Sequence, residues 1–290
     1  MRAAAVQLGS SLDKAQNRRA LERAVRAVTE LGAELVVLPE AVMSGFGSKE
    51  TDLSAAAEAL DGPFVATLAG LSGSTGATVV AGMFEAVPGE RRVYNTVVVT
   101  SDGSLVGRYR KLHLYDALGW VESERVVPGD PGDDGILVVA VGELTVGVMT
   151  CYDLRFPEMA RALVDAGADT LAVPAAWVAG TRKVEQWRAL LAARAIESTA
   201  YVVAAAQPGP EYSGHTTIID PSGAVLAELD AKADAAAPPA PAPTGPPPWL
   251  AQADVVPSEV AAVRAQMPVL ANRRFSVVAG GAAGATTPTR

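Results

Sequence analysis

LTVGVMTCYDLRFPEMAR, residues 144–161, predicts an abrupt change from strand to helix. The stretch begins with an apolar run, Leu144 to Met149, whose β-branched side chains are typical of a buried strand. Pro157 is suited to the first position of a helix, where its missing N–H is no loss, and Gly167 is suited to end that helix. We therefore expect a strand, a tight turn and a helix in direct succession.

Cys151, the only cysteine of the chain, falls in that turn. A thiol on a strand-to-helix turn lies beside free backbone N–H groups, which can lower its pKa and can hold an oxyanion. A lone cysteine is also commonly a small buried hydrophobic residue. This stretch by itself therefore leaves a nucleophile and a core residue as equal alternatives.

Composition narrows the classes of function. The chain has 290 residues, 49% of them hydrophobic, and a net charge of −8 with a pI near 4.9. It can therefore bury a large core, and its acidic balance argues against nucleic acid or an anionic membrane as a partner. One cysteine excludes an internal disulfide framework, and two histidines make a Cys/His zinc site improbable. No apolar run reaches the length of a signal peptide or a membrane span, so we expect a cytoplasmic protein.

Apolar runs and periodic segments alternate along the chain in the manner of a layered α/β domain. Helices are expected at residues 12–31 and around residues 184–196. We expect a single domain over residues 1–278, with a mobile Ala/Pro-rich loop at 231–248 inside it and a flexible tail at 279–290. Strands are expected at residues 3–8, 34–38, 78–84, 93–100, 105–109, 136–141, 144–149, 170–173, 201–206, 216–220 and 224–229.

Two charged residues stand at the ends of other predicted strands. Glu40 follows strand 34–38 and has apolar neighbours on both sides, which favours partial burial over an ordinary surface position. Lys111 follows strand 105–109 among tyrosines and leucines, a setting in which a buried ammonium needs a carboxylate partner. Arg108 and Arg110, which both precede Lys111 in the same stretch, are expected to be solvated.

A carboxylate, an ammonium and a thiol at strand ends together suit one kind of chemistry. The carboxylate can take the thiol proton and pass it to a leaving amine, while the thiolate attacks a carbonyl or nitrile carbon. The ammonium is expected to favour the thiolate and, with a backbone N–H, to stabilise the oxyanion; one such donor lowers the barrier by about 3 kcal/mol. Glu40, Lys111 and Cys151 therefore predict a thiol hydrolase that works through a thioester.

The chain resembles the nitrilase superfamily of carbon–nitrogen hydrolases from Ala3 to Arg274, nearly its whole length. Three stretches carry the resemblance: LPEA around Glu40, YRKLHLYD around Lys111 and CYDLRFPEMAR from Cys151. The resemblance implies an α/β fold of the nitrilase type, a four-layer αββα sandwich. It also implies hydrolysis of an amide-type C–N bond without a cofactor or metal, by a homodimer or larger homo-oligomer.

Within the superfamily, the chain is most similar to the Nit-type amidase branch, through CYDLRFPE, PAAW at 174–177, ARAIE at 193–197 and GHTTIIDPSG at 214–223. That branch acts on small ω-amides of dicarboxylates or on deaminated glutathione. Two departures lie near the expected acyl pocket: Gln186 precedes Trp187 where the branch usually has histidine, and Trp177 stands where phenylalanine is more usual. The identity of the substrate therefore stays open.

The resemblance also implies catalytic roles for single residues. Glu40 would act as general base and acid, Lys111 would stabilise the tetrahedral intermediate, and Cys151 would be the nucleophile. The second glutamate of the family falls on Glu122, which would hold Lys111 and orient the substrate. Glu124 is the alternative if the alignment of this loop shifts.

Three further residues are expected to contact the substrate. Tyr152 would supply its backbone N–H as a second oxyanion donor, and Trp177 would line the acyl pocket. Arg155 would bind a substrate carboxylate, because related carbamoylases carry an arginine at this offset and its guanidinium fork matches a carboxylate. A structural ion pair of Arg155 with Asp153 or Glu158 is an equally good interpretation.

These residues leave alternatives for the function. The first is an amidase that releases ammonia from a small carboxylated amide by way of a cysteine thioester. The second is an N-carbamoyl amino acid hydrolase or a nitrilase that uses the same Glu-Lys-Cys set. The third, of another class, is a non-catalytic partner protein on the same scaffold.

Overall fold

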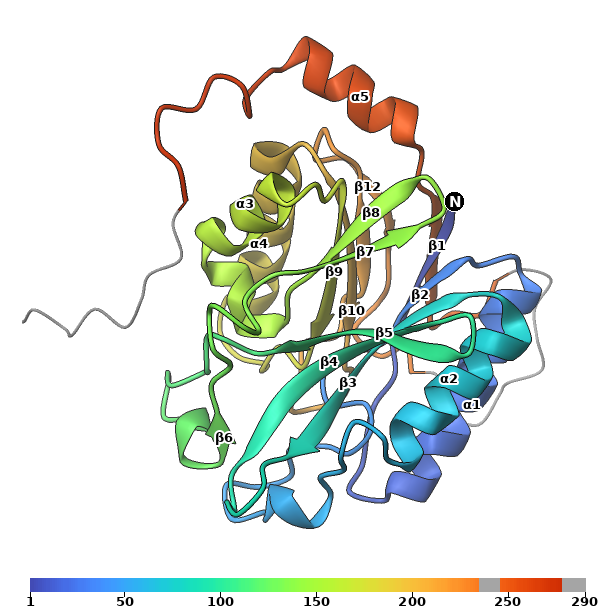
Figure 1. Ribbon diagram of the computed structural model, residues 1–290, viewed down its shortest axis with the longest axis vertical. Helices are drawn as coiled ribbons and strands as arrows, with labels where there is room; N and C mark the ends of the chain where they lie inside the picture. Colours follow the sequence, from blue (N-terminus) through green and yellow to red (C-terminus); the bar gives the residue numbers. More distant parts are fainter. Residues whose placement is uncertain (235–245, 278–290) are drawn as a thin grey trace, which may run out of the picture.

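The computed structural model describes residues 1–234 and 246–277 (Figure 1). Two β-sheets lie face to face, with helices on the outer side of each sheet. The predicted four-layer αββα sandwich is therefore confirmed. Much of the predicted mobile loop at 231–248 and the whole predicted tail at 279–290 lie outside the described residues. Among the helices of the described ranges, none is both long and apolar enough to cross a membrane.

The first sheet joins the N-terminal half of the chain to one strand from near its C-terminus. β1 (Arg2–Val6) pairs in parallel with β2 (Leu35–Val37) and antiparallel with β13 (Leu250–Asp254). The sequence analysis did not predict a strand at β13. The order across the sheet is β13 (Leu250–Asp254), β1 (Arg2–Val6), β2 (Leu35–Val37), β3 (Thr78–Ala86), β4 (Val93–Ser101) and β5 (Ser104–Arg110), with β6 (Val126–Val127) paired to β4.

The second sheet comes from the middle of the chain and has two antiparallel hairpins at its edges. Its central strands run parallel to one another, as the alternation of strand and helix predicts. The order is β12 (Val225–Glu228), β11 (Thr217–Ile219), β10 (Tyr201–Ala206), β9 (Thr170–Ala175), β8 (Leu144–Val148) and β7 (Leu137–Val141).

Helices α1 (Lys14–Glu30) and α2 (Pro63–Thr75) cover the outer face of the first sheet, and α3 (Pro157–Asp165) and α4 (Lys183–Ser198) cover that of the second (Figure 1). Asp13 caps the first helix by accepting hydrogen bonds from the N–H groups of Ala15 and Gln16. Three other helices have proline at their first position, which suits a start without a partner for the N–H. The helices are α1 (Lys14–Glu30), α2 (Pro63–Thr75), α3 (Pro157–Asp165), α4 (Lys183–Ser198) and α5 (Pro257–Gln266).

Alternation along the strands divides the apolar residues between two cores. Ala3 and Ala5 of β1 belong to the cluster between the sheets, whereas Ala4 and Val6 belong to the cluster under α1 and α2. Small side chains on β1 and β10 bring the two sheets into close contact. The active-site candidates follow strands of both sheets, so this close packing is what brings them together.

Candidate active site

Cys151 begins a tight turn directly after β8. The turn is a 3₁₀ helix, Cys151–Arg155, that separates the strand from α3. Thr150 and Asp153 close it reciprocally: the Thr150 N–H donates to the Asp153 carboxylate at 2.9 Å, and the Asp153 N–H bonds back to Thr150. Cys151 itself has a φ of 47°, in the left-handed region that a non-glycine residue rarely occupies. Tertiary contacts therefore hold the thiol in a strained position.

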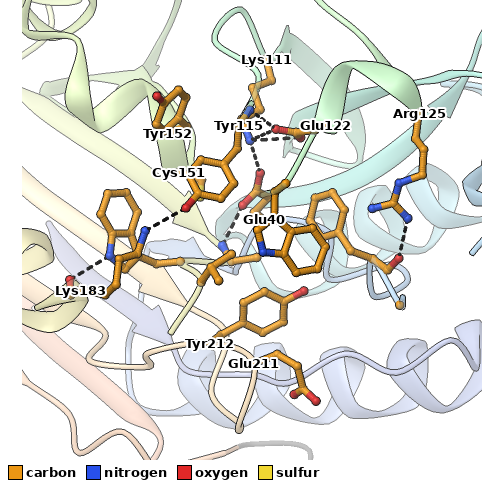
Figure 2. A pocket seen from close by; sticks show the side chains of 16 residues that line it. Glu40, Lys111, Tyr115, Glu122, Arg125, Cys151, Tyr152, Lys183, Glu211 and Tyr212 are labelled. Atoms are coloured by element: carbon orange, nitrogen blue, oxygen red, sulfur yellow. Dashed lines mark hydrogen bonds and ion pairs between the residues drawn. The ribbon is translucent and has the colours of Figure 1, made fainter. Parts of the chain in front are cut away.

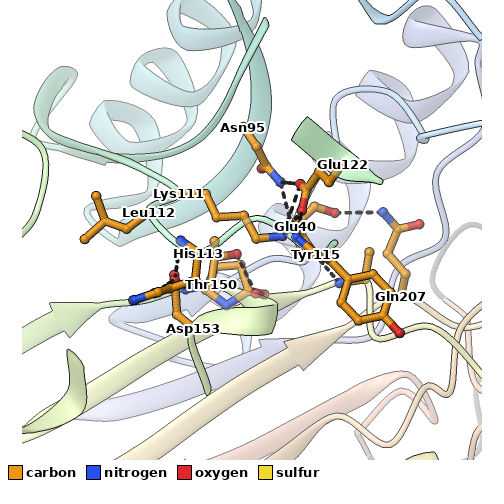
Figure 3. Close-up of polar contacts among 12 residues, drawn as sticks. Glu40, Asn95, Lys111, Leu112, His113, Tyr115, Glu122, Thr150, Asp153 and Gln207 are labelled. Carbon is orange, nitrogen blue, oxygen red and sulfur yellow. Dashed lines mark hydrogen bonds and ion pairs between the residues drawn. The ribbon is translucent and has the colours of Figure 1, made fainter. Parts of the chain in front are cut away.

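Asp153 ties this turn to the strand that carries Lys111. Its buried carboxylate accepts a hydrogen bond from the Tyr109 hydroxyl at 2.7 Å. It also lies 2.7 Å from His113 Nδ1 (Figure 3). Burial and the charge of Asp153 raise the pKa of Tyr109 well above its ordinary value. His113 is thus engaged with the turn and makes no dyad with Cys151.

Lys111 lies between two carboxylates at the end of β5. Its side chain is 2% exposed, and its Nζ lies 2.9 Å from Glu40 Oε1 and 2.8 Å from Glu122 Oε2 (Figures 2 and 3). Burial acts to lower the pKa of Lys111, but the charges of Glu122 and Glu40 outweigh it and raise the pKa well above its ordinary value. The ammonium therefore stays charged inside the protein.

Glu40 follows β2 and is 1% exposed. Its Oε2 accepts a hydrogen bond from the Ala176 N–H at 2.8 Å, and its Oε1 accepts one from Asn95 Nδ2 at 2.8 Å. Its backbone carbonyl accepts a further bond from Gln207 Nε2 at 2.7 Å. Burial acts to raise the pKa of Glu40, but the charge and hydrogen bond of Lys111 prevail and lower it below 4.5. Glu40 is thus an ionised, fixed base.

Glu122 is the carboxylate that pairs with Lys111, whereas Glu124 is exposed. The Glu122 side chain is 7% exposed, and all of its hydrogen bonds are accepted ones. Besides Lys111, its donors are Asn95 Nδ2 at 3.0 Å and the Tyr115 N–H at 2.6 Å. One amide group, that of Asn95, thus bridges both glutamates (Figure 3).

The thiol of Cys151 differs from the expectation in its protonation. Burial and the charge of Glu40 raise the pKa of Cys151 well above its ordinary value, and Lys111 offsets this only in part. Lys111 thus favours the thiolate as expected, but burial and Glu40 outweigh its effect in the free protein. The thiol is neutral at pH 7, and a base has to take its proton during the reaction.

The catalytic candidates open into one cavity of about 670 Å³, counting its mouth (Figure 2). Glu40, Lys111, Glu122 and Cys151 line its floor, and Tyr152 and Trp177, both predicted substrate contacts, line its walls. The cavity also contains residues that the sequence analysis did not identify: Phe46, Gly47, Tyr115, Trp120, Arg125, Ala176, Val178, Lys183, Glu211 and Tyr212.

Arg155 does not line this cavity, and neither interpretation of it is supported. Its guanidinium stacks on Trp177, 4.8 Å from the ring centroid, and donates to Gln186 Oε1 at 2.7 Å. Among the described residues it forms no ion pair with Asp153 or Glu158. Arg155 therefore contacts Trp177, a residue of the cavity wall, without itself lining the cavity.

Arg108 and Arg110, which precede Lys111, were expected to be solvated, but both form ion pairs. Arg110 pairs with Glu85 and lies 4.0 Å from the ring centroid of Tyr94, while Arg108 pairs with Asp134. Alternation along β5 places Lys111 on the opposite side of the strand end from Arg110. Sequence proximity to the site therefore does not make these arginines part of it.

Asn95 is the clearest residue that sequence reasoning missed. It interrupts the apolar strand VYNTVVVT with a fully buried amide, and such a residue needs hydrogen-bond partners. That signal was available in the sequence. Lys183 gave no such signal, because a lysine at the start of a helix is usually a surface residue.

Comparison with known proteins agrees with this geometry. The sequence model of the family described as carbon-nitrogen hydrolase matches residues 2–265. The chain is 41% identical over 249 residues to the deaminated glutathione amidase of Escherichia coli O157:H7, covering 85% of this chain and 87% of that one. It is similar in structure to a CN-hydrolase superfamily protein of Xanthomonas campestris with an arsenic adduct in the active site (TM-score 0.80, 25% identity, 96% and 98% coverage). It is also similar to Saccharomyces cerevisiae Nit3, a member of branch 10 of the nitrilase superfamily (TM-score 0.75, 26% identity, 95% and 97% coverage).

Proposed function

The chain belongs to the carbon–nitrogen hydrolase family, and from this premise we propose that it hydrolyses small carboxylated amides through a Cys151 thioester, with release of ammonia. Membership confirms the predicted resemblance to the nitrilase superfamily and its Nit-type amidases. It also makes the protein an enzyme that acts on C–N bonds other than peptide bonds. The observation that carries the finer proposal is the Lys111 ammonium, held by Glu40 and Glu122 in the cavity that contains the thiol.

In the first half of the reaction, the ionised Glu40 carboxylate takes the Cys151 proton as sulfur attacks the amide carbon. The carbonyl oxygen becomes an oxyanion, which the Lys111 ammonium and the Tyr152 N–H stabilise. Glu40 then gives its proton to the nitrogen, the C–N bond breaks, and ammonia leaves. The acyl group remains on sulfur as a thioester.

In the second half, Glu40 takes a proton from a water molecule, and the resulting hydroxide attacks the thioester carbon. The same donors hold the second oxyanion. The C–S bond breaks, the proton returns to sulfur, and the acid product leaves. The raised pKa of Cys151 supports this scheme, because the thiolate is then a good base toward the proton on Glu40 and regenerates the neutral thiol.

The proposed substrate class rests on the cavity and on the relatives. Aromatic walls and several cations suit an acyl chain that ends in a carboxylate. The relative from Escherichia coli O157:H7 is named for deaminated glutathione, and glutathione carries carboxylates. A nitrile or an N-carbamoyl amino acid would use the same catalytic set, and the products separate these cases: carbon dioxide with ammonia marks a carbamoylase.

The test measures ammonia release from small ω-amides, carbamoyl amino acids and nitriles by the purified protein and by Cys151→Ala. We expect turnover of at least one carboxylated ω-amide, none by Cys151→Ala, and a covalent acyl adduct on Cys151 by mass spectrometry of quenched reactions. Activity that survives Cys151→Ala would contradict the proposal. Turnover confined to nitriles or carbamoyl compounds would replace the substrate class and keep the machinery.

We also propose that the protein works in the cytoplasm as a homodimer or larger homo-oligomer, without nucleic acid or membrane partners. What supports this proposal is the resemblance to the nitrilase superfamily, which implies such assemblies. Light scattering coupled to gel filtration measures the mass, and a monomer across micromolar concentrations would contradict this proposal.

A further inference from the structure

Lys183 stands in the cavity wall as the first residue of α4. The preceding residue, Arg182, has a φ of 58°, so the chain turns sharply before the helix begins. The carbonyl of Lys183 accepts a hydrogen bond from Trp177 Nε1 at 2.9 Å, which fixes the helix start to the wall. The lysine is 5% exposed. A cation that would ordinarily reach into solvent is therefore held inside the site.

The Lys183 ammonium has no anionic partner in the part of the chain that the structure describes. Its one hydrogen bond there goes to the Tyr115 hydroxyl at 3.4 Å (Figure 2). The rings of Trp177 and Tyr115 flank it, with Nζ 4.6 Å and 5.0 Å from their centroids. An ammonium has three donors, and aromatic faces stabilise its charge only in part. The ammonium therefore has donors left for a ligand.

The other cations near the cavity are already engaged. Lys111 is bound by two carboxylates, and Arg125 Nη1 donates to the backbone carbonyls of Phe46 and Ser48. Arg155 stacks on Trp177 and does not line the cavity. Burial is the larger cause that lowers the pKa of Lys183, and the charge of Arg155 is the next. An anion bound at Lys183 would offset both effects. Lys183 is thus the buried cation of the cavity that has no carboxylate partner among the described residues, whereas Arg125 is only half-buried and is held by backbone carbonyls.

We propose that Lys183 binds the carboxylate of the substrate, with the Tyr115 hydroxyl as a second donor, and so selects carboxylated amides over neutral ones. The inference rests on the proposed amidase function and names the residue that reads the substrate's charge. One ammonium and one hydroxyl match the two oxygens of a carboxylate. Lys183 is the first residue of α4, so the positive end of this helix dipole lies beside the same ammonium. Cys151 and Lys183 then hold opposite ends of one substrate in one cavity.

The first experiment separates binding from turnover. Glutaramate and its neutral isostere glutaramide are titrated into Cys151→Ala protein by calorimetry, with and without Lys183→Met. We expect Cys151→Ala to bind glutaramate at least 10-fold more tightly than glutaramide. Lys183→Met should weaken glutaramate binding by about 10- to 100-fold, the usual range for a lost hydrogen bond to a charged group, and leave glutaramide within about 3-fold.

Two controls keep the result interpretable. Lys183→Arg retains a cation and should retain the preference for glutaramate, and Lys232→Met removes an exposed lysine and should change nothing. Thermal melting checks that each variant is folded. If Lys183→Met does not fold, the preference of the parent protein and its retention in Lys183→Arg still decide the question.

The outcomes distinguish this inference from the proposed function. Equal affinity for glutaramate and glutaramide, or an unchanged preference in folded Lys183→Met, would overturn the role of Lys183, whatever the turnover. A loss of preference in Arg155→Met with Lys183→Met unaffected would assign the carboxylate to Arg155 instead. Binding of glutaramate could depend on Lys183 while the protein with Cys151 intact releases no ammonia from it. That result would count against the proposed amidase reaction and not against the role of Lys183.

Discussion

Replacing Glu122 by glutamine removes one charge from the centre of the site and keeps the shape of the side chain. Oε1 accepts from Asn95 Nδ2 and Lys111 Nζ at 3.0 and 3.1 Å, and Oε2 accepts from Lys111 Nζ and the Tyr115 N–H at 2.8 and 2.6 Å. An amide in either orientation therefore directs its NH₂ group at two donors. Glu122→Gln creates a buried conflict that rotation of the side chain cannot relieve.

The magnitude follows from burial and from the remaining partner. Breaking a buried ion pair typically costs about 3–5 kcal/mol, and because Glu40 still faces Lys111 we expect about 3 kcal/mol of lost unfolding free energy. At about 2–4 °C per kcal/mol, the melting temperature should fall by roughly 6–12 °C. A displaced Lys111 also weakens the oxyanion contact, so kcat should fall by about 10²- to 10³-fold.

Glu124→Gln is the matched control, because it makes the same change two residues away on an exposed side chain. Calorimetric melting and initial rates of ammonia release are measured for both variants under the same conditions. We expect Glu124→Gln to match the parent protein within about 2-fold in kcat and 1 °C in melting temperature, as surface substitutions usually do. Equal effects of the two substitutions, or a Glu122→Gln variant with parental kcat, would refute the reasoning.

Three further predictions concern protonation, the turn at the nucleophile and the surrounding ion pairs. Because the pKa of Glu40 lies below 4.5, activity on the neutral glutaramide should persist as the pH falls through 4.5 and disappear only at the lower pKa of Glu40 in the folded protein. A pH–rate profile with its acid limb centred above 4.5 would contradict this. Asp153→Asn places an amide against the donors of the turn, so the unfolding free energy measured in urea should fall by about 1–3 kcal/mol. Because Cys151 loses its support, kcat should fall with little change in KM. An unchanged kcat would show that the turn keeps its shape without Asp153. Arg110→Met removes the ion-pair partner of the buried Glu85, so the unfolding free energy should fall by about 1–3 kcal/mol while kcat stays within about 2-fold of the parent value. A large loss of activity would mean that Arg110 acts on the site.

Periodicity along the chain was enough to predict most of the strands, whereas the four-layer sandwich was expected from the resemblance to the family. The strands before Glu40, Lys111 and Cys151 lie close to their expected positions, because a buried strand needs a continuous apolar run. β13 was missed because LAQAD lacks such a run and follows a segment rich in alanine and proline. Its pairing with β1 is long-range, and no local pattern announces it.

The electrostatics of the site could be predicted only in part. A buried lysine in an aromatic setting demanded a carboxylate, and Lys111 has one on each side. The pKa of Cys151 was expected to fall because the sequence shows neighbouring charges and not burial. Desolvation depends on how the two sheets pack. Whether it outweighs the effect of nearby charges on the pKa of Cys151 is therefore decided by the tertiary structure.

By itself, the sequence determined the α/β sandwich, the family and the three residue types at strand ends, because each of these depends on local pattern or on motif. Only the tertiary structure decided that Glu122 and not Glu124 faces Lys111, that Asn95 bridges the two glutamates, and that Arg155 stacks on Trp177. The physical reason is the same in each case: a side chain's charge state and partners are set by distances across packed layers, which residues far apart in the chain create together.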